Sequence, residues 1–275
     1  MNNNFALIIG AMKCGTTSLF HYLAEHPQIT AASDKEPHFF SEESNSEKKL
    51  DKYRSLWQWQ PEHRVALEAS TTYTMHPKYE DVPERIARVK DADFRFIYIM
   101  RHPFLRVESH IRHLLAEGYQ NTVEVIEEHL AFSEYARQLD RYVELFGRDR
   151  IHLLLLEDLQ NNPQTELCRI CQFLGVDSDY IFGNIDLVMN SKSTLNLHPT
   201  IRQIYRIPTV KSIGRLIPPK IRQKLYNPLK SGKIQDVRLS DRDREIIFER
   251  LQPDLAKLQA TYGVDVAQKW KLPLS

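Results

Sequence analysis

The chain has few cysteines and no apolar run long enough to cross a bilayer. Its three cysteines, Cys14, Cys168 and Cys171, are too few for a disulfide-stapled scaffold. The first residues, "MNNNFALIIGAMKCG", lack the basic n-region of a secretion signal, and their apolar stretch is short. These absences predict a protein of the reducing cytoplasm with no transmembrane segment.

An excess of charge of either sign is also missing, since 37 Lys or Arg stand against 36 Asp or Glu, a net charge of +1. A chain so close to neutral is not expected to bind nucleic acid. The exception is the segment 187–235, which has no acidic residue but ten Lys or Arg and five prolines. This composition predicts a basic, loop-rich lobe with a lid-like role.

No pattern in the sequence requires a metal. Cys168 and Cys171 lie in the helical pattern "TELCRICQFLG", and no second Cys/His pair has finger spacing, so we interpret them as core-facing residues. His110 and His113 have helical spacing without a third ligand, which favours an ordinary helix surface. Glu68 lies near the end of a predicted strand, where it could serve as a metal ligand. The pattern does not call for a metal, however, and we predict no metal site.

Four short apolar runs predict buried parallel strands, at 5–10, 65–70, 95–100 and 151–157. A helical pattern follows each one, at 17–26, 82–90, 103–118 and 163–175. Pro103 and Pro163 suit helix starts, while Gly118 and Gly175 suit helix ends. The alternation predicts one α/β domain over 1–275, with helices on both faces of a parallel sheet. Its core would cover about 5–190, and a pair of helices would follow at about 240–262.

The stretch "GAMKCGTTS" lies where the first predicted strand meets the first helix. Gly10 and Gly15 have the spacing of a phosphate loop, but Thr16 takes the position where such loops carry lysine, and Lys13 precedes the second glycine. Backbone N–H groups and the helix N-terminus attract an anion there, and Lys13 adds a full positive charge. The loop therefore predicts a phosphate site.

A second anion site is predicted at the end of "FRFIYIM", where Arg101 is followed by a helix that starts at Pro103 and carries Ser109. Ligands of open parallel sheets bind at the carboxyl ends of the strands, and both Gly10 and Arg101 fall there. A triphosphate hydrolase would be expected to place a magnesium-binding aspartate at a strand end. The arginine favours a second anion instead.

Five segments in this order closely resemble the sulfotransferases that use 3′-phosphoadenosine 5′-phosphosulfate (PAPS), in the heparan-sulfate-type and bacterial branch. The resemblance runs over about residues 5–190, and the segments are "GAMKCGTTS", "KEPHFF", "EASTTY", "RFIYIMRHPFLRVESHIRH" and "LLLLEDLQNNPQTELCRICQFLGV". It implies a P-loop-like fold and PAPS as the sulfo donor, with no metal.

The resemblance also assigns site residues. The residues implied for the 5′-phosphosulfate are Lys13, Cys14, Gly15, Thr16, Thr17 and Ser18. Arg101 and Ser109 are implied for the 3′-phosphate. The family's basic loop over the nucleotide is matched loosely by "NSKSTLNLHPTIR", which points to Lys192 and Arg202.

For catalysis, Lys13 is expected to stabilise the leaving phosphate oxygen. In heparan-type relatives a glutamate two residues before His-Phe-Phe is the base, which implies Glu36 here. His38 is the alternative base, because histidine titrates near neutral pH. Several of these relatives carry a lysine after the glutamate of "EASTTY", where this chain has Ala69, and this departure speaks against a heparan-like polymer acceptor. A small molecule or carbohydrate is expected instead.

Two other functions remain open at this point. One is a P-loop kinase or NTPase, against which Thr16 in the lysine position argues. The other is a non-catalytic anion-binding module that attaches to acidic lipid through "IGRLIPPKIRQKLYNPLK", although prolines interrupt that stretch. The sequence does not fix the oligomeric state, the acceptor, or whether an oxygen or a nitrogen is sulfated.

Overall fold

The computed structural model describes residues 3–42, 47–116, 129–183 and 237–274. Within these ranges, five parallel strands form one sheet in the order β2-β3-β1-β4-β5. The strands are β1 (Asn4–Gly10), β2 (Ile29–Ala31), β3 (Val65–Ala69), β4 (Asp93–Met100) and β5 (Ile151–Leu155). The basic segment 187–235, with Lys192 and Arg202, lies outside the described residues, so what the sequence predicts for it stays a prediction.

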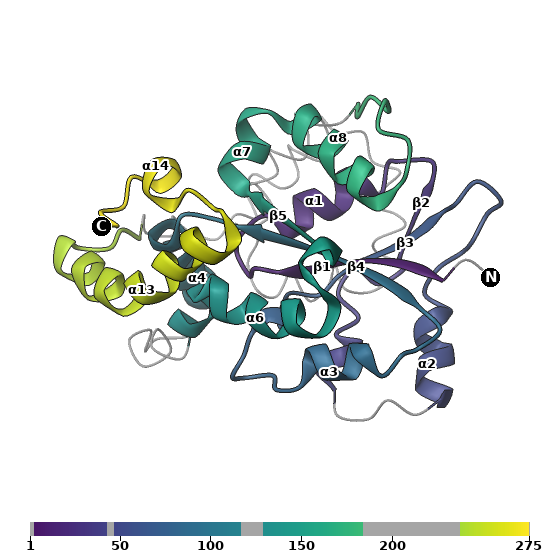
Figure 1. Ribbon diagram of the computed structural model, residues 1–275, viewed down its shortest axis with the longest axis horizontal. Helices are drawn as coiled ribbons and strands as arrows, with labels where there is room; N and C mark the ends of the chain where they lie inside the picture. The colour runs from purple at the N-terminus through teal and green to yellow at the C-terminus, as the bar shows by residue number, and fades with distance from the viewer. Residues whose placement is uncertain (1–2, 43–46, 117–128, 184–236, 275) are drawn as a thin grey trace.

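Helices cover both faces of the sheet, as the strand–helix alternation predicts. Helices α1, α7 and α8 lie on one face, and α3 and α6 lie on the other (Figure 1). The helices of the described ranges are α1 (Thr16–Leu23), α2 (Glu47–Arg54), α3 (Val82–Ala87), α4 (Pro103–Ala116), α6 (Tyr135–Phe146), α7 (Leu156–Asn161), α8 (Pro163–Leu174), α13 (Asp241–Tyr262) and α14 (Val266–Trp270).

The four predicted strands are confirmed, and their burial explains why. Strands β1 and β4 lie at the centre, with Phe5 of β1 in register with Ala66 of β3 on one side and Phe94 of β4 on the other. Strands covered on both faces need apolar side chains at consecutive positions, which is the pattern visible in the sequence. Strand β2 was missed because three residues give no such run. The fourth run ends as a strand at Leu155, and α7 begins at Leu156.

The C-terminal helices differ from the prediction. The expected helix pair at 240–262 is a single helix, α13, which continues through Pro253. Its start is secured by a capping box in which the Ser240 hydroxyl accepts from the Asp243 N–H. The carboxylate of Asp254 accepts the N–H groups of Ala136 and Arg137 at 3.0 and 2.8 Å, so α13 caps the start of α6. The prediction of a pair was wrong because tertiary packing outweighs the helix-breaking tendency of a proline.

None of the helices in the described part of the chain combines the length and the apolar character that a bilayer crossing requires.

Candidate active site

Three loops lie side by side at the carboxyl edge of the sheet, because they follow the neighbouring strands β3, β1 and β4. The middle loop, which follows β1, is tied to both of its neighbours. Thr74, in the turn after β3, donates its hydroxyl to the Ile9 carbonyl at 2.7 Å, and the Ala11 N–H donates to the Ile99 carbonyl at 2.7 Å. The predicted phosphate loop is therefore held between the other two predicted motifs.

The loop "GAMKCG" adopts a conformation that depends on glycine at its end. Gly15 has φ +90° and directly precedes α1, and a Cβ there would lie 2.7 Å from Cδ1 of Leu156. Lys13 also has a positive φ, of 68°. The first turn of α1 carries no acidic residue, so its dipole presents an uncompensated positive end. Thr17 is exposed and Ser18 is half-buried at that end, whereas Thr16 is buried.

Cys14 faces the interior rather than the open side of the loop. Its thiol is fully buried, 3.8 Å from the hydroxyl of Tyr135 and 3.7 Å from the Met12 carbonyl. Burial raises the pKa of this thiol to about 12, so it stays protonated. Its N–H donates to the Ala11 carbonyl at 3.1 Å. A role of Cys14 in donor binding stays a prediction, and the structure gives its thiol a place in the packing beneath the loop.

Arg101 follows β4 and is half-buried, and the residue after it shapes the start of α4. The Nδ1 atom of His102 lies 3.3 Å from the Phe104 N–H and accepts its hydrogen bond, which caps the helix. This requires a neutral ring, and the pKa of His102 is indeed lowered, first by burial and also by Arg101. Ser109 lies further along α4, half-buried, and the first turn of α4 has no acidic residue.

The loop before the 3-10 turn Phe39–Ser41 brings both candidate bases together. The carboxylate of Glu36 pairs with Lys35, lies 3.8 Å from Nε2 of His38, and accepts the Thr71 hydroxyl at 3.5 Å. Nδ1 of His38 is 3.0 Å from the Thr72 hydroxyl. The side chains of Glu36 and His38 are 32% and 41% exposed, so both are reachable from solvent. The geometry keeps both as candidates.

Beneath this loop lies the buried carboxylate of Glu68, for which the sequence suggested no role except that of a metal ligand. Glu68 is fully buried in β3 and accepts the hydroxyls of Tyr53 and Tyr73, each at 2.9 Å, and of Ser70 at 3.2 Å. Burial raises its pKa to about 7, although these hydrogen bonds partly oppose the shift. Three hydroxyl donors satisfy this carboxylate. The described residues contain no group of three or more His, Cys, Asp or Glu that could hold a metal ion.

The histidine pair on α4 is only partly as expected. His110 is buried rather than part of a helix surface, with its Nδ1 3.5 Å from Arg106 and its ring against that of His129. Burial and then the Arg106 charge lower its pKa to about 2, so it remains neutral. His113 is half-buried. The surface interpretation of His110 was wrong because Arg106, one turn away, is itself buried and faces the same side of α4.

The cysteine pair of α8 is a pair of free thiols. Cys171 is buried in the core and Cys168 is half-buried. The core-facing interpretation is therefore confirmed for Cys171.

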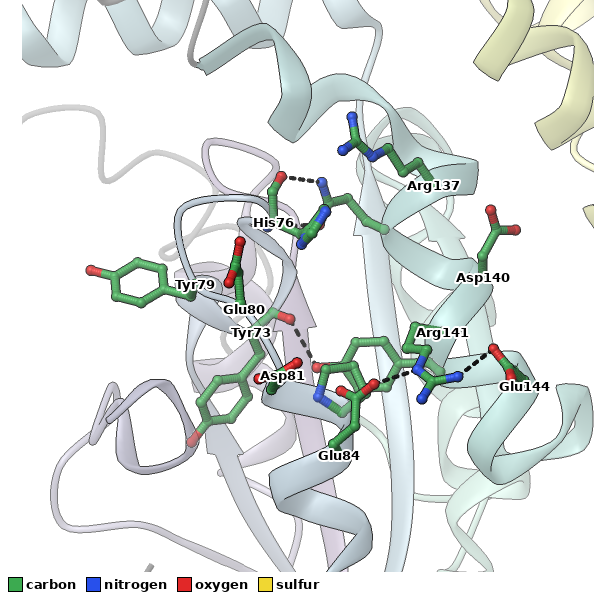
Figure 2. Close-up of a pocket in the computed structure, with 13 residues that line it drawn as sticks. Tyr73, His76, Tyr79, Glu80, Asp81, Glu84, Arg137, Asp140, Arg141 and Glu144 are labelled. Carbon is green, nitrogen blue, oxygen red and sulfur yellow. Dashed lines mark hydrogen bonds and ion pairs between the residues drawn. The ribbon is translucent and has the colours of Figure 1, made fainter. Parts of the chain in front are cut away.

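A hollow of about 430 Å³ lies elsewhere, between the loop that follows Thr74 and helix α6 (Figure 2). Its charged side chains largely pair with one another, since Arg141 contacts both Glu84 and Glu144 and Asp140 pairs with Lys257. None of the site residues predicted from the sequence lines it. The hollow therefore lies apart from the loops at the carboxyl edge of the sheet that carry those residues.

A family model for the sulfotransferase domain matches residues 4–202, which is more than half of the chain. The chain belongs to this family. Among curated relatives, the sulfotransferase domain is 29% identical over 189 residues to heparan sulfate glucosamine 3-O-sulfotransferase 5 of Mus musculus and of Homo sapiens. These matches cover 62% of this chain and 53% of each relative. The chain thus spans about half the length of the curated relatives that it matches.

Solved structures show the same fold. A sulfotransferase from Alicyclobacillus acidocaldarius superposes with a TM-score of 0.67 at 23% identity, over 99% of both chains. The mouse sulfotransferase SULT7A1, solved in complex with PAP, superposes with a TM-score of 0.51 at 15% identity, over 98% of this chain and 87% of that one. These likenesses confirm the P-loop-like α/β fold of the sulfotransferase domain.

Proposed function

We propose that this sulfotransferase domain is an active enzyme that transfers a sulfuryl group from PAPS to a hydroxyl or amine of a carbohydrate or small molecule. The product nucleotide would be 3′-phosphoadenosine 5′-phosphate. One observation carries the proposal: the two predicted anion motifs follow the neighbouring strands β1 and β4, and the predicted acceptor loop, which follows β2, is hydrogen-bonded to the end of β3 on the other side of β1. A donor with two separate phosphate groups and an acceptor need three such adjacent places.

The residues at the middle loop fit a phosphosulfate. The N-terminus of α1 carries N–H donors without an acidic side chain nearby in its first turn, and Lys13 stands in the loop before it. Thr17 is exposed at the same end and offers a hydroxyl donor. Arg101 and Ser109 would hold the 3′-phosphate, with a helix start that is likewise free of acidic residues in its first turn.

The reaction assigned to these residues is an in-line transfer. Glu36 takes the proton of the acceptor group, whose oxygen or nitrogen then forms its bond to sulfur while the bond from sulfur to the phosphate oxygen breaks. Lys13 stabilises the negative charge that grows on that phosphate oxygen. His38 is the second candidate for the proton acceptor, because it lies beside Glu36. Positive charge at the site is supplied by Lys13, Arg101 and backbone N–H groups, so we expect no metal requirement.

The acceptor is proposed only as a class. The named relatives are glucosamine 3-O-sulfotransferases, which supports a carbohydrate hydroxyl. Ala69, where several of these relatives have lysine, is fully buried in β3 and offers no charge to an anionic polymer. The three cysteines are free thiols, which supports the cytoplasm as the setting.

The deciding experiment is an acceptor screen with PAPS, read by mass spectrometry as the gain of one sulfo group. Transfer should persist in the presence of a chelator and should disappear in Lys13→Ala. Adenosine 5′-phosphosulfate, which lacks the 3′-phosphate, should be a poor donor. Magnesium-dependent turnover of ATP, with none of PAPS, would instead establish the kinase alternative.

A further inference from the structure

The peptide group that joins Arg101 to His102 is held from both sides by side chains of distant elements. Its carbonyl accepts the hydroxyl of Tyr135 at 2.7 Å, and its N–H donates to Oε1 of Glu157 at 2.9 Å. Tyr135 is the first residue of α6 and is fully buried, and Glu157 lies in the first turn of α7. Both polar groups of a single peptide plane are therefore fixed.

The two side chains that hold this peptide are themselves held by the C-terminal helices. Trp270 of α14 donates its indole N–H to Oε2 of Glu157 at 3.3 Å, and its ring packs against that of Tyr135 with centroids 5.8 Å apart. Asp254 of α13 caps the helix that Tyr135 begins. We call the contacts of Tyr135 and Glu157 with the Arg101–His102 peptide the clamp on Arg101. This clamp is part of the packed structure rather than a surface contact.

Tyr135 also reaches the phosphate loop. Its hydroxyl lies 3.8 Å from Sγ of Cys14, and both side chains are completely buried. The same hydroxyl thus contacts the loop assigned to the 5′-phosphosulfate and the backbone of the arginine assigned to the 3′-phosphate. A shift of one motif relative to the other would disturb this hydroxyl, so Tyr135 couples their positions.

We propose that Tyr135 and Glu157 are positioning residues that aim Arg101 at the 3′-phosphate of the donor nucleotide, at a fixed spacing from the phosphate loop. The inference rests on the proposed function. The two hydrogen bonds hold ψ of Arg101 and so fix the stretch of backbone from which the arginine side chain extends. Fixing that peptide in advance reduces the entropy lost when the side chain binds its anion.

The chain offers a matched control on the same helix. Tyr142 of α6 is also buried, and its hydroxyl donates to a backbone carbonyl, that of Tyr73, at 2.9 Å. Tyr142→Phe therefore removes the same kind of hydrogen bond as Tyr135→Phe, without touching Arg101. If the two variants lose similar stability but differ in nucleotide affinity, the difference arises because only the Tyr135 hydroxyl bonds to the backbone of Arg101.

Calorimetry of the full chain with two nucleotides tests the proposal. 3′-Phosphoadenosine 5′-phosphate carries the 3′-phosphate, and adenosine 5′-monophosphate lacks it. Tyr135→Phe should weaken binding of the first roughly three- to tenfold, the range for one lost neutral hydrogen bond, and leave the second nearly unchanged. Tyr142→Phe should preserve the ratio of the two affinities, with a similar fall in melting temperature.

Trp270→Phe tests the role of Glu157, since it keeps an aromatic ring but removes the N–H that donates to Glu157. We expect this variant to lower the ratio of the affinities for the two nucleotides by about twofold, which corresponds to the smallest usual contribution of one hydrogen bond. An unchanged ratio in Trp270→Phe would remove Glu157 from the proposal. An unchanged ratio in Tyr135→Phe, or an equal loss for both nucleotides, would overturn it for Tyr135. Wild-type protein that binds both nucleotides equally would instead refute the donor assignment.

Discussion

The backbone N–H of His38 donates a hydrogen bond of 3.2 Å to the hydroxyl of Ser70, and this contact joins the acceptor loop to the end of β3. The same hydroxyl donates to the buried carboxylate of Glu68 at 3.2 Å. One residue earlier in the strand, the Ala69 N–H donates to the Lys35 carbonyl at 3.0 Å. The loop that carries Glu36 is therefore held to β3 on both sides of that residue.

We predict that Ser70→Ala lowers turnover by roughly tenfold, because a displacement of Glu36 by a fraction of an ångström impairs proton transfer. Donor affinity should change less than twofold, since Ser70 does not belong to either anion motif. Ser41→Ala is the control: it removes a hydroxyl that donates to Thr72 at 2.5 Å but leaves the backbone anchor intact. Steady-state kinetics with the identified acceptor would show this, and equal turnover in the two variants would refute the anchoring role.

The raised pKa of Glu68, about 7 in the folded protein against 4.5 for a free glutamate, predicts a pH dependence of stability. Because the folded state holds this proton more tightly, the stabilisation is complete below about pH 4.5 and is lost as the pH rises towards 7. The shift corresponds to a contribution on the order of 3 kcal/mol.

Urea unfolding at pH 5 and pH 8 measures this effect. Glu68→Gln has no such proton, so its free energy of unfolding should fall less between the two pH values than that of the wild type. Comparing the two proteins cancels groups that titrate in both, such as Asp254, whose pKa burial raises to about 6. Parallel pH profiles for the two proteins would show that Glu68 is ionised throughout this range.

Elements with a local signature were predictable from the sequence. The four longer strands follow from apolar runs, and the strand–loop–helix arrangement of the proposed phosphate loop follows from Gly10, Gly15 and Lys13. The clamp on Arg101 was not predictable, because Tyr135 and Glu157 are 34 and 56 residues further along the chain and each looks like an ordinary helix residue. The role of Glu68 was missed for a related reason: two of its donors, Tyr53 and Tyr73, come from different elements.

We predict that Gly15→Ala destabilises the protein and weakens donor binding. The new methyl group would lie 2.7 Å from Leu156 Cδ1, in addition to the cost of about 1–2 kcal/mol for a left-handed alanine. Gly263→Ala is the matched control, since its φ is +69° but a Cβ there meets no atom within 4 Å. Melting curves and nucleotide titrations should show the smaller loss in Gly263→Ala, with donor affinity unaffected. Equal losses of stability and of donor affinity in the two variants would mean that Leu156 of α7 moves to make room for the methyl group.

Lys13→Ala and Arg101→Ala should weaken donor binding in different ways. Each removes a charge-assisted contact, which is worth roughly tenfold or more in affinity. Loss of Lys13 should affect adenosine nucleotides with and without the 3′-phosphate alike, whereas loss of Arg101 should abolish the preference for the 3′-phosphate. Lys257→Ala removes a cation that pairs with Asp140, and it should change neither affinity. Calorimetry decides the matter, and a preserved preference in Arg101→Ala would reassign the 3′-phosphate site.

The choice between the two bases is tested by Glu36→Gln and His38→Asn. Glutamine keeps the shape of glutamate and can still accept from Thr71, but it cannot take a proton at neutral pH. If Glu36 is the base, turnover should fall roughly 10²- to 10⁴-fold while nucleotide affinity hardly changes. Asparagine at position 38 can replace the hydrogen bond to Thr72, so His38→Asn should cost much less.

Lys35 provides the control for this last prediction, because it pairs with Glu36 without being a candidate base. Lys35→Met removes its charge, and if Glu36 is the base it should reduce turnover less than Glu36→Gln does. The acidic limb of the pH–rate profile should vanish in Glu36→Gln and persist in His38→Asn. The reverse pattern would make His38 the base. High activity in both variants would mean that the acceptor loses its proton without help from this loop, as an amine or phenol can.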